Sequence, residues 1–206
     1  MSYFISLDGM DGAGKSTQLA LLKNWFEAQR RPVYFTREIG GTALGVNLRE
    51  IILNPKNNLD PLAELLLVFS ARRQHIEEVI RPKLRQGIIV VSDRFTDATY
   101  AYQGSGRQIS WQLIAALEHW ILADFRPQLA LILNVSAATA AQRLSQRAGE
   151  KDRIELENSE FFERVRQGYL RRAAENPQAR LIDANGSAGE TFAQIELALN
   201  QLLGTL

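Results

Sequence analysis

A glycine-rich stretch near the start of the chain limits the possible folds more than any other feature. Residues 9–16 read Gly-Met-Asp-Gly-Ala-Gly-Lys-Ser and fit the pattern G-x-x-x-x-G-K-[ST]. The apolar run Tyr3–Leu7 predicts a buried strand before it, and apolar side chains between residues 19 and 26 recur at helical spacing after it. Such a strand-to-helix turn directs backbone N–H groups around phosphate oxygens. The stretch therefore predicts an α/β sheet that binds a nucleotide.

We expect the residues of this loop to bind a nucleoside triphosphate together. We expect Lys15 to bridge the β- and γ-phosphates and the Ser16 hydroxyl to bind Mg²⁺. The alternative is a glycine-rich turn that binds nothing, but motif and context rarely coincide by accident. ATP and Mg²⁺ are therefore the expected cofactors of a phosphoryl-transfer enzyme. The expected nucleotide-binding residues of the loop are Gly9, Met10, Asp11, Gly12, Ala13, Gly14, Lys15, Ser16 and Thr17.

The rest of the chain alternates short apolar strands with helices. Further strands are predicted at Val33–Thr36, Ile88–Ser92, Leu129–Leu133 and Arg180–Ile182. Helices are predicted through Leu44, Leu48 and Ile52, from Pro61 toward Pro82-Lys83-Leu84, and over Trp111–Leu122, Ala138–Arg147, Ser159–Ala174 and Gly189–Leu203. Because strands alternate with helices, we expect one α/β domain over residues 1–206, with a five-stranded parallel sheet covered on both faces.

The composition limits the other partners of the chain. Lys and Arg total 24 and Asp and Glu total 23, so no large positive field would attract nucleic acid or anionic lipid. The chain has no cysteine, which excludes disulfides and thiolate zinc sites. The N-terminus lacks the pattern of a secretion signal, and the apolar run Leu65–Phe69 is too short to span a membrane. We expect small-molecule partners, no nucleic acid, no membrane and a cytoplasmic location.

Charged residues at strand ends and on an apolar helix bear on whether the γ-phosphate passes to water or to a second substrate. Asp93 and Arg94 follow a predicted central strand, where open α/β sheets bind ligands, and Asp93 is a candidate second metal ligand. Arg37 ends another strand, and Arg72 and Arg73 lie on an otherwise apolar helix. The planar fork of arginine suits a phosphate, although each arginine could instead be solvated or salt-bridged. Together they favour a kinase whose acceptor itself carries a phosphate.

Five motifs along the chain resemble those of bacterial thymidylate kinases. They are Asp8–Thr17, Thr36–Thr42, Asp93–Phe95, Ala101–Gly104 and Asp152–Glu155. They cover nearly the whole chain, in order and at plausible spacing. The resemblance implies transfer of the ATP γ-phosphate to dTMP, giving dTDP. It also implies a five-stranded P-loop kinase fold with a lid segment, and a homodimer.

The resemblance assigns residues to the acceptor. It implies that Arg37 and Arg94 clamp the acceptor phosphate and that the Asp11 carboxylate lies near the sugar 3′-hydroxyl. The expected substrate-binding residues are Asp11, Arg37, Glu38, Phe69, Arg72, Arg94, Thr99, Tyr102 and Gln103. The expected catalytic residues are Lys15, Arg37, Asp93, Arg94 and Arg147, with Ser16 and Asp93 at the metal.

The thymine and the sugar are assigned to an apolar helix and a tyrosine motif. The resemblance implies that Phe69 and Arg72 hold the base, and that Tyr102 and Gln103 close over sugar and base. For Phe69 the alternative is a core position, because it lies in an apolar helical stripe. For Tyr102 it is a buried packing position with a satisfied hydroxyl.

A basic cluster after the fourth strand occupies the place where this family has a mobile lid, about residues 143–155. Its members are Arg143, Arg147, Lys151 and Arg153. Since Gly12 stands where some family members carry an arginine, the lid is expected to supply the transition-state cation. Arg147 is the expected supplier, with Arg143 as the alternative, so Arg147→Ala should lower turnover far more than ATP affinity. The cluster could instead be a solvated helix face.

Some features depart from the family or leave choices open. Ile39 stands where the family usually has proline, and the lid is one residue longer before Asp152. Asp152 and Glu155 either anchor the lid or reach the metal, and His75 and His119 are expected to be structural. The alternatives to dTMP phosphorylation are another small-molecule or nucleoside monophosphate kinase and a nucleotide-dependent switch.

Overall fold

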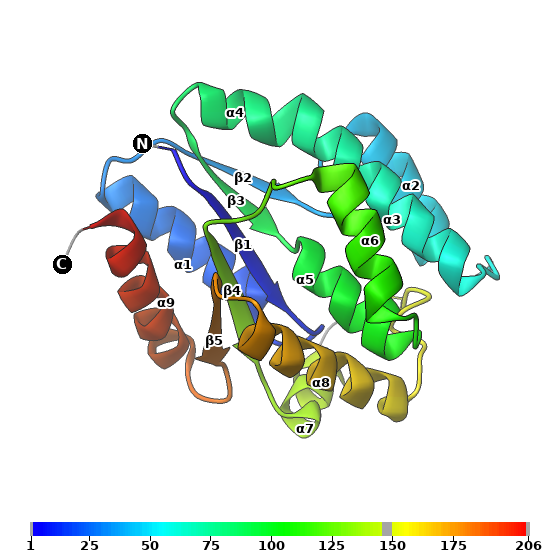
Figure 1. The fold of residues 1–206 in the computed structure, drawn as a ribbon. Helices are drawn as coiled ribbons and strands as arrows, with labels where there is room; N and C mark the ends of the chain where they lie inside the picture. Colours follow the sequence, from blue (N-terminus) through cyan, green and yellow to red (C-terminus); the bar gives the residue numbers. More distant parts are fainter. Residues whose placement is uncertain (1, 146–149, 205–206) are drawn as a thin grey trace.

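Five parallel strands form the sheet of the protein. The computed structural model describes residues 2–145 and 150–204. The strands lie in the order β2-β3-β1-β4-β5, and all neighbours are parallel (Figure 1). This confirms the predicted sheet, with strand ends within two residues of those expected from the sequence. The strands are β1 (Phe4–Gly9), β2 (Val33–Arg37), β3 (Ile89–Asp93), β4 (Leu129–Asn134) and β5 (Ala179–Asp183).

The register of the sheet brings the carboxyl ends of three strands to one edge. All six residues of β1 are buried, as expected for a central strand, whereas the outer strand β2 is partly exposed. Strand pairing sets Asp93 beside Leu7 on one side and Arg37 on the other. Since β1 lies between β3 and β4, the loop after it opens where open α/β sheets bind ligands.

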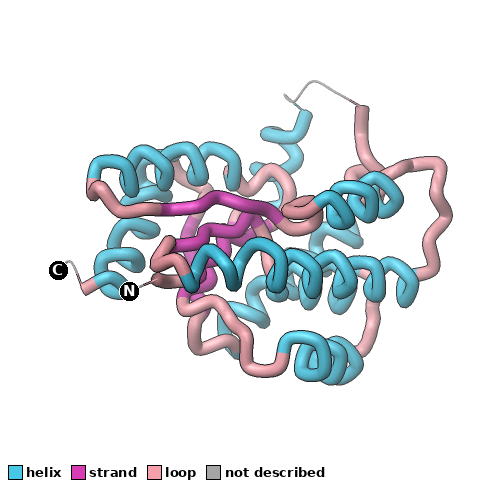
Figure 2. Tube along the Cα trace, turned by 90° about the horizontal axis from the view of Figure 1, so that it is seen from above, coloured by secondary structure: helices cyan, strands magenta, loops and turns pink. Residues whose placement is uncertain are grey.

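Helices cover both faces of the sheet (Figure 2). On one face α1 (Lys15–Ala28) packs on α9 (Ala188–Leu203), where Trp25 Nε1 donates a hydrogen bond of 2.9 Å to Glu196. On the other face lie α5 (Thr96–Thr99), the π-helical segment η2 (Tyr100–Gly106) and α8 (Ser159–Glu175). The other helical elements are α2 (Ala43–Leu53), α3 (Pro61–His75), the π-helical η1 (Ile76–Ile80), α4 (Arg81–Arg85), α6 (Trp111–Leu122) and α7 (Ala137–Ser145).

The helix that begins at Pro61 ends within one residue of the predicted end. It continues from α3 through η1 into α4 and ends at Arg85. The Arg81 N–H donates to the Ile76 carbonyl, so a wider π turn precedes Pro82. Pro82 then falls in the first turn of α4, where a proline that lacks an N–H is tolerated.

The pattern of the sequence predicts no helix between β3 and Trp111, yet α5 and η2 occupy residues 96–106. Most of their residues are buried, so the segment has no polar face to give a helical periodicity. Gly168 of α8 permits close packing on η2, because a Cβ there would lie 2.9 Å from the Ala101 Cα. Tertiary packing therefore decides the conformation of this segment.

The helices and the expected lid complete the description of the chain. None of the helices in the described part of the chain is long and apolar enough to cross a membrane. The expected lid begins at the end of α7 and resumes at Glu150, and Arg147 lies outside the described residues.

Candidate active site

The loop after β1 has the geometry that its glycines require. Gly9, Gly12 and Gly14 have φ angles of 138°, 82° and 93°, which disfavour any residue with a Cβ. At Gly12 a Cβ would also lie only 2.5 Å from the Ala140 carbonyl oxygen. Lys15, the first residue of α1, is buried, and its Nζ donates to the Gly9 carbonyl at 2.9 Å. The loop thus leads into a helix N-terminus, which favours bound anions.

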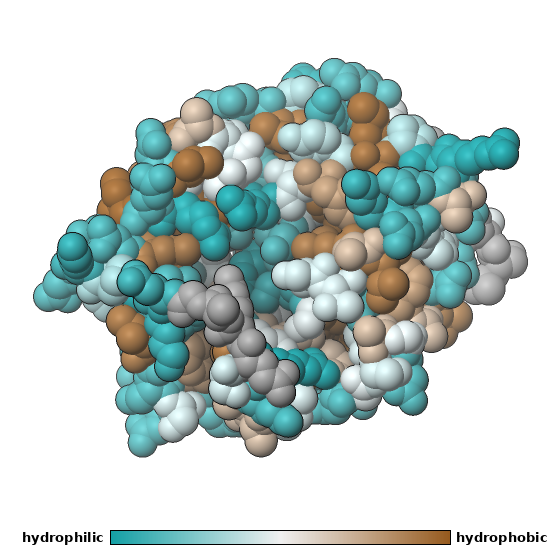
Figure 3. All heavy atoms as spheres, turned by 180° about the vertical axis from the view of Figure 1, so that it is seen from behind, coloured by the Kyte–Doolittle hydropathy of each residue, from teal (hydrophilic) through white to brown (hydrophobic). Residues whose placement is uncertain are grey.

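A cavity of about 660 Å³ opens over this loop. Figure 3 shows a hollow on the face of the molecule seen there, with hydrophilic and hydrophobic residues around it. The predicted residues that line the cavity are Asp11, Gly12, Gly14, Lys15, Ser16, Thr17, Arg37, Glu38, Arg72, Asp93, Arg94, Tyr102, Gln103 and Arg143. The predicted residues that the structure describes outside this lining are Gly9, Met10, Ala13, Phe69 and Thr99. The loop, the strand-end arginines and the tyrosine motif therefore meet in one place.

Arg94 lies at the centre of a hydrogen-bonded cluster beside the loop. Its Nη2 donates to Asp11 at 2.5 Å and to the Tyr102 hydroxyl at 3.2 Å. Its Nη1 donates to the Gly9 carbonyl and to the Tyr169 hydroxyl, each at 3.0 Å. Arg94 has a φ of 71°, an uncommon backbone conformation for a residue with a side chain. The surrounding acceptors fix its guanidinium at the wall of the cavity.

The charges in this cluster stabilise one another. Burial, the largest single effect, would lower the pKa of Arg94, but Asp11, Tyr102 and Tyr169 together outweigh it and hold that pKa well above its usual value. Burial alone would raise the pKa of Asp11, but Arg94 and then Lys15 hold it well below its usual range. Burial, and next the neighbouring Arg94, lower the pKa of Lys15. A bound polyphosphate would favour the charged form of Lys15, since an opposite charge opposes both effects.

Arg72 is fixed on a second wall of the cavity. Its guanidinium lies 5.3 Å from the ring centroids of both Phe69 and Phe95. Nε donates to Glu38 at 2.6 Å, Nη1 to the Thr99 hydroxyl at 2.8 Å, and Nη2 to the Phe95 carbonyl at 3.0 Å. Because a guanidinium has five N–H groups, two further donors remain for a ligand. Glu38 and Thr99 thus position Arg72.

Phe69 occupies a core position, which was the alternative for this residue. It is 1% exposed and packs with Leu65, Tyr100 and Ile114. Val68, its neighbour on α3, lines the cavity together with Arg72. Phe69 itself is not among the residues that line the cavity, so its contact with the base stays a prediction.

The lid residues that the structure describes have different partners. Arg143 of α7 donates to the Ala184 carbonyl at 3.0 Å and to Gly12 at 3.4 Å, so it braces the loop. Arg153 donates to Glu64 at 2.5 Å and to the Ile52 carbonyl at 2.7 Å. Asp152 accepts the backbone N–H groups of residues 154 and 155 and lines the cavity. Lys151 is exposed.

Comparison with known proteins decides the family. The family model described as thymidylate kinase matches residues 7–195. The chain belongs to the thymidylate kinase family.

Similar proteins agree with this membership along the whole chain. A thymidylate kinase of Neisseria gonorrhoeae (strain NCCP11945) is 54% identical over 202 residues, which are 98% of each chain. One from Dichelobacter nodosus is 48% identical over 200 residues, 97% of this chain and 98% of the other. The crystal structure of thymidylate kinase from Ehrlichia chaffeensis has a TM-score of 0.77 at 31% identity and covers 96% of this chain and 98% of that one. The resemblance and the predicted fold are confirmed, and the chain is a nucleotide-dependent phosphotransferase.

A thymidylate kinase has to neutralise the charge of the phosphates that it binds. Two residues of this chain, Ser16 and Asp93, suit a hard cation. The Asp93 Oδ1 is buried and has no hydrogen-bond partner among the described residues, and Asp93 lines the cavity with Ser16. Carboxylate and hydroxyl oxygens suit Mg²⁺, which is usually held by one or two protein groups together with phosphates. No group of three acidic or histidine residues that could hold a metal occurs in residues 2–145 and 150–204. Phosphate oxygens would thus complete the coordination.

Three residues of this kinase site were not predicted from the sequence. Arg49 of α2 lines the cavity and donates to the Ile39 carbonyl at 3.1 Å. Its apolar neighbours Leu48 and Ile52 hide it within an ordinary amphipathic pattern. Tyr169 reaches Arg94 from α8, and no local signal indicates such a contact. Val68 differs from its apolar neighbours only in the direction in which it points.

Proposed function

We propose that this chain transfers the γ-phosphate of ATP to dTMP, giving dTDP and ADP. One observation carries the proposal: the phosphate loop and the side chains of Arg37 and Arg94 line the same cavity. A loop of this kind holds a donor phosphate, and the arginines offer a second anion site beside it. The relatives named thymidylate kinase support dTMP as the acceptor.

In this proposal the chain works by positioning and charge neutralisation. Lys15 and the loop amides hold the donor, while Arg37 and Arg94 hold the acceptor phosphate. The acceptor oxygen needs no general base, because the second pKa of a phosphate monoester is about 6. Ser16 and Asp93 would hold Mg²⁺, which supplies neutralisation of phosphate charge.

We assign the rest of the acceptor to the second wall of the cavity. The free N–H groups of Arg72 suit a base carbonyl, and Val68 provides the apolar surface beside it. Asp11 and Tyr102 are hydrogen-bonded to each other at 2.9 Å and suit the sugar. Arg147 of the lid is the proposed transition-state cation, so Arg147→Ala should lower turnover far more than ATP affinity. An unchanged turnover number in this variant would exclude that role.

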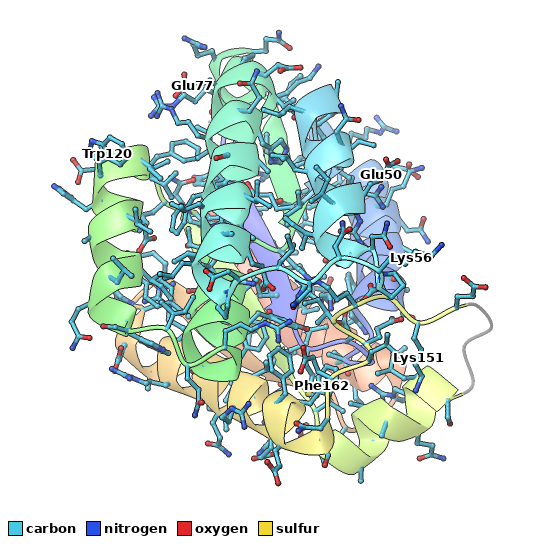
Figure 4. The ribbon with its side chains drawn as sticks, turned by 90° about the vertical axis from the view of Figure 1, so that its right-hand side faces the viewer. Glu50, Lys56, Glu77, Trp120, Lys151 and Phe162 are labelled. Carbon is cyan, nitrogen blue, oxygen red and sulfur yellow. The ribbon has the colours of Figure 1, made fainter. Side chains whose placement is uncertain are left out.

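A homodimer in the cytoplasm completes the proposal. Helices α3 and α6 lie side by side and carry exposed apolar residues, including Leu66 at 53% and Trp120 at 81% exposure. Trp120 points away from the body of the molecule (Figure 4). Exposed apolar side chains can mark protein interfaces, and in this proposal a second copy covers those of α3 and α6. If Trp120→Lys leaves the mass in sedimentation equilibrium at that of the wild-type dimer, α6 is not the interface.

The test is release of ADP from ATP and Mg²⁺ across all nucleoside monophosphates. We expect ADP formation to depend on the acceptor, with dTMP giving the largest kcat/KM. Preference for AMP or dCMP would replace dTMP by another acceptor. Slow ATP turnover without dependence on any acceptor would favour a nucleotide-dependent switch instead.

A further inference from the structure

His75, the last residue of α3, lies beneath the wall of the cavity and has no part in the mechanism above. Its side chain is 2% exposed. The ring bridges two elements: Nδ1 lies 3.1 Å from Glu38 Oε1, and Nε2 lies 2.7 Å from the Thr36 hydroxyl. Gly41 packs against the ring so closely that a Cβ there would lie 2.3 Å from Nε2. The imidazole thus fits between α3 and the loop after β2.

Glu38 connects His75 to Arg72. One carboxylate oxygen faces His75, and the other accepts from Arg72 Nε at 2.6 Å. Arg72 and His75 are three residues apart on α3, which places both side chains on one face of the helix. Since a carboxylate only accepts hydrogen bonds, His75 Nδ1 carries the proton in this contact. The buried Glu38 therefore has one donor on each side.

We propose that His75 is a positioning residue for the acceptor site, acting through Glu38 on Arg72. This inference rests on the proposed function, because it takes Arg72 as the group that meets the acceptor base. With both donors present, the Glu38 carboxylate has a fixed orientation and so does the Arg72 guanidinium. Loss of the His75 contact frees one carboxylate oxygen inside a buried site, and the carboxylate then turns away from Arg72 to satisfy it.

Two amide substitutions separate the contacts of the ring. An Asn amide nitrogen falls near the position of Nδ1 and can still donate to Glu38, whereas a Gln amide falls near Nε2 and faces Thr36. We expect His75→Gln to raise KM for dTMP about 10-fold. We expect His75→Asn to keep KM for dTMP near the wild-type value, and both variants to keep KM for ATP. His119→Asn, at an exposed position on α6, is the control for the loss of a histidine.

The same variants distinguish positioning from a merely structural role. His75→Asn and His75→Gln should have similar melting temperatures in thermal unfolding. Only the Gln variant should lose affinity for dTMP in calorimetric titration. In a Glu38→Gln background, His75→Gln should add little further loss, because the two changes interrupt the same connection. If His75→Gln does not fold, Thr36→Val and Glu38→Gln provide the comparison, with the loss of dTMP affinity expected only in the latter.

The outcomes separate this inference from the function on which it rests. Equal KM values for dTMP in the Asn and Gln variants, with an active wild type, would overturn the role of His75 alone. Equal rises in KM for ATP and dTMP would do the same. A wild-type protein that neither binds nor phosphorylates dTMP would overturn the proposed function and this inference with it.

Discussion

The Asp11 carboxylate and the Arg94 guanidinium lie 2.5 Å apart, and together they join the phosphate loop to the end of β3. All four terminal N–H groups of Arg94 have acceptors, which are Gly9, Asp11, Tyr102 and Tyr169. This position requires the planar guanidinium of arginine, because the ammonium group of a lysine cannot make this set of contacts.

Arg94→Lys keeps the positive charge and removes the fork. We expect kcat/KM for dTMP to fall about 100-fold, because both the acceptor clamp and the contact with Asp11 lose their geometry. Steady-state kinetics with each substrate varied would measure this, and KM for ATP should change little. Arg171→Lys, at an exposed site on α8, is the matched control. Near wild-type activity in Arg94→Lys would mean that charge alone suffices at this position.

Arg143 braces the phosphate loop from α7. Its contacts with the carbonyls of Gly12 and Ala184 tie α7 to the loop and to the end of β5. Arg143→Ala should raise KM for ATP about 10-fold, since two hydrogen bonds from a charged group are lost. KM for dTMP should stay near its wild-type value. Gln142→Ala, at the exposed neighbouring position, is the control, and an equal rise in both KM values would contradict the assignment.

Local sequence signals predict the sheet and the phosphate loop. Each strand is a short apolar run next to turn residues, and Gly9, Gly12 and Gly14 stand where positive φ angles require them. These signals are contained within a few neighbouring residues. Packing against distant elements alters the ends of these strands by a residue or two but leaves the strands themselves in place.

Contacts between distant elements are what the sequence does not predict. Tyr169 lies 75 residues from Arg94, and Glu64 lies 89 residues from Arg153, yet both pairs are hydrogen-bonded. Val68 and Phe69 are adjacent on a helix, so their side chains point about 100° apart. Since α3 carries apolar residues on much of its surface, periodicity cannot tell which of the two faces the cavity.

Asp8 is fully buried under the phosphate loop, and it makes stability depend on pH. Burial, and next the neighbouring Asp97, raise the pKa of Asp8 to about 7. The folded chain therefore holds this proton more tightly than the unfolded chain, whose Asp has a pKa of about 3.9. Stability should fall as the pH rises from about 4 to about 7 and then level off.

Asp8→Asn removes this titration. The variant should gain stability relative to the wild type across that window, reaching about 2 to 4 kcal/mol above pH 7. Urea unfolding at several pH values would measure the difference. Asp183→Asn provides the contrast, because the pKa of Asp183 is shifted in the opposite direction. Hydrogen bonds from Asn185 lower the pKa of this exposed carboxyl. A pH-independent difference between Asp8→Asn and the wild type would contradict the raised pKa.

Val68 and Phe69 should separate binding from stability. Phe69→Leu leaves a space in the core cluster and should lower the free energy of unfolding by about 1 to 3 kcal/mol, with KM for dTMP unchanged. Val68→Thr keeps the shape and places a hydroxyl on the cavity wall, so it should raise KM for dTMP about 3- to 10-fold. Thermal unfolding and steady-state kinetics on both variants measure the two effects. A larger rise in KM for Phe69→Leu than for Val68→Thr would assign the base contact to Phe69.

Glu64 joins the lid to the acceptor side of the cavity through a carboxylate with no exposed surface. It accepts from Gln103 at 2.7 Å, from Arg107 at 3.3 Å and from Arg153 at 2.5 Å. Glu64→Gln keeps the shape but leaves two arginines without a buried counter-charge, so unfolding should become easier by about 3 to 5 kcal/mol. Glu157→Gln removes only the more exposed partner of Arg107 and should cost under about 1 kcal/mol. Because Gln103 and Arg153 share this carboxylate, Glu64→Gln should also raise KM for dTMP, whereas Glu157→Gln should not. Equal losses of stability in urea unfolding of the two variants would mean that the ion pairs of Glu64 contribute no more than an exposed ion pair.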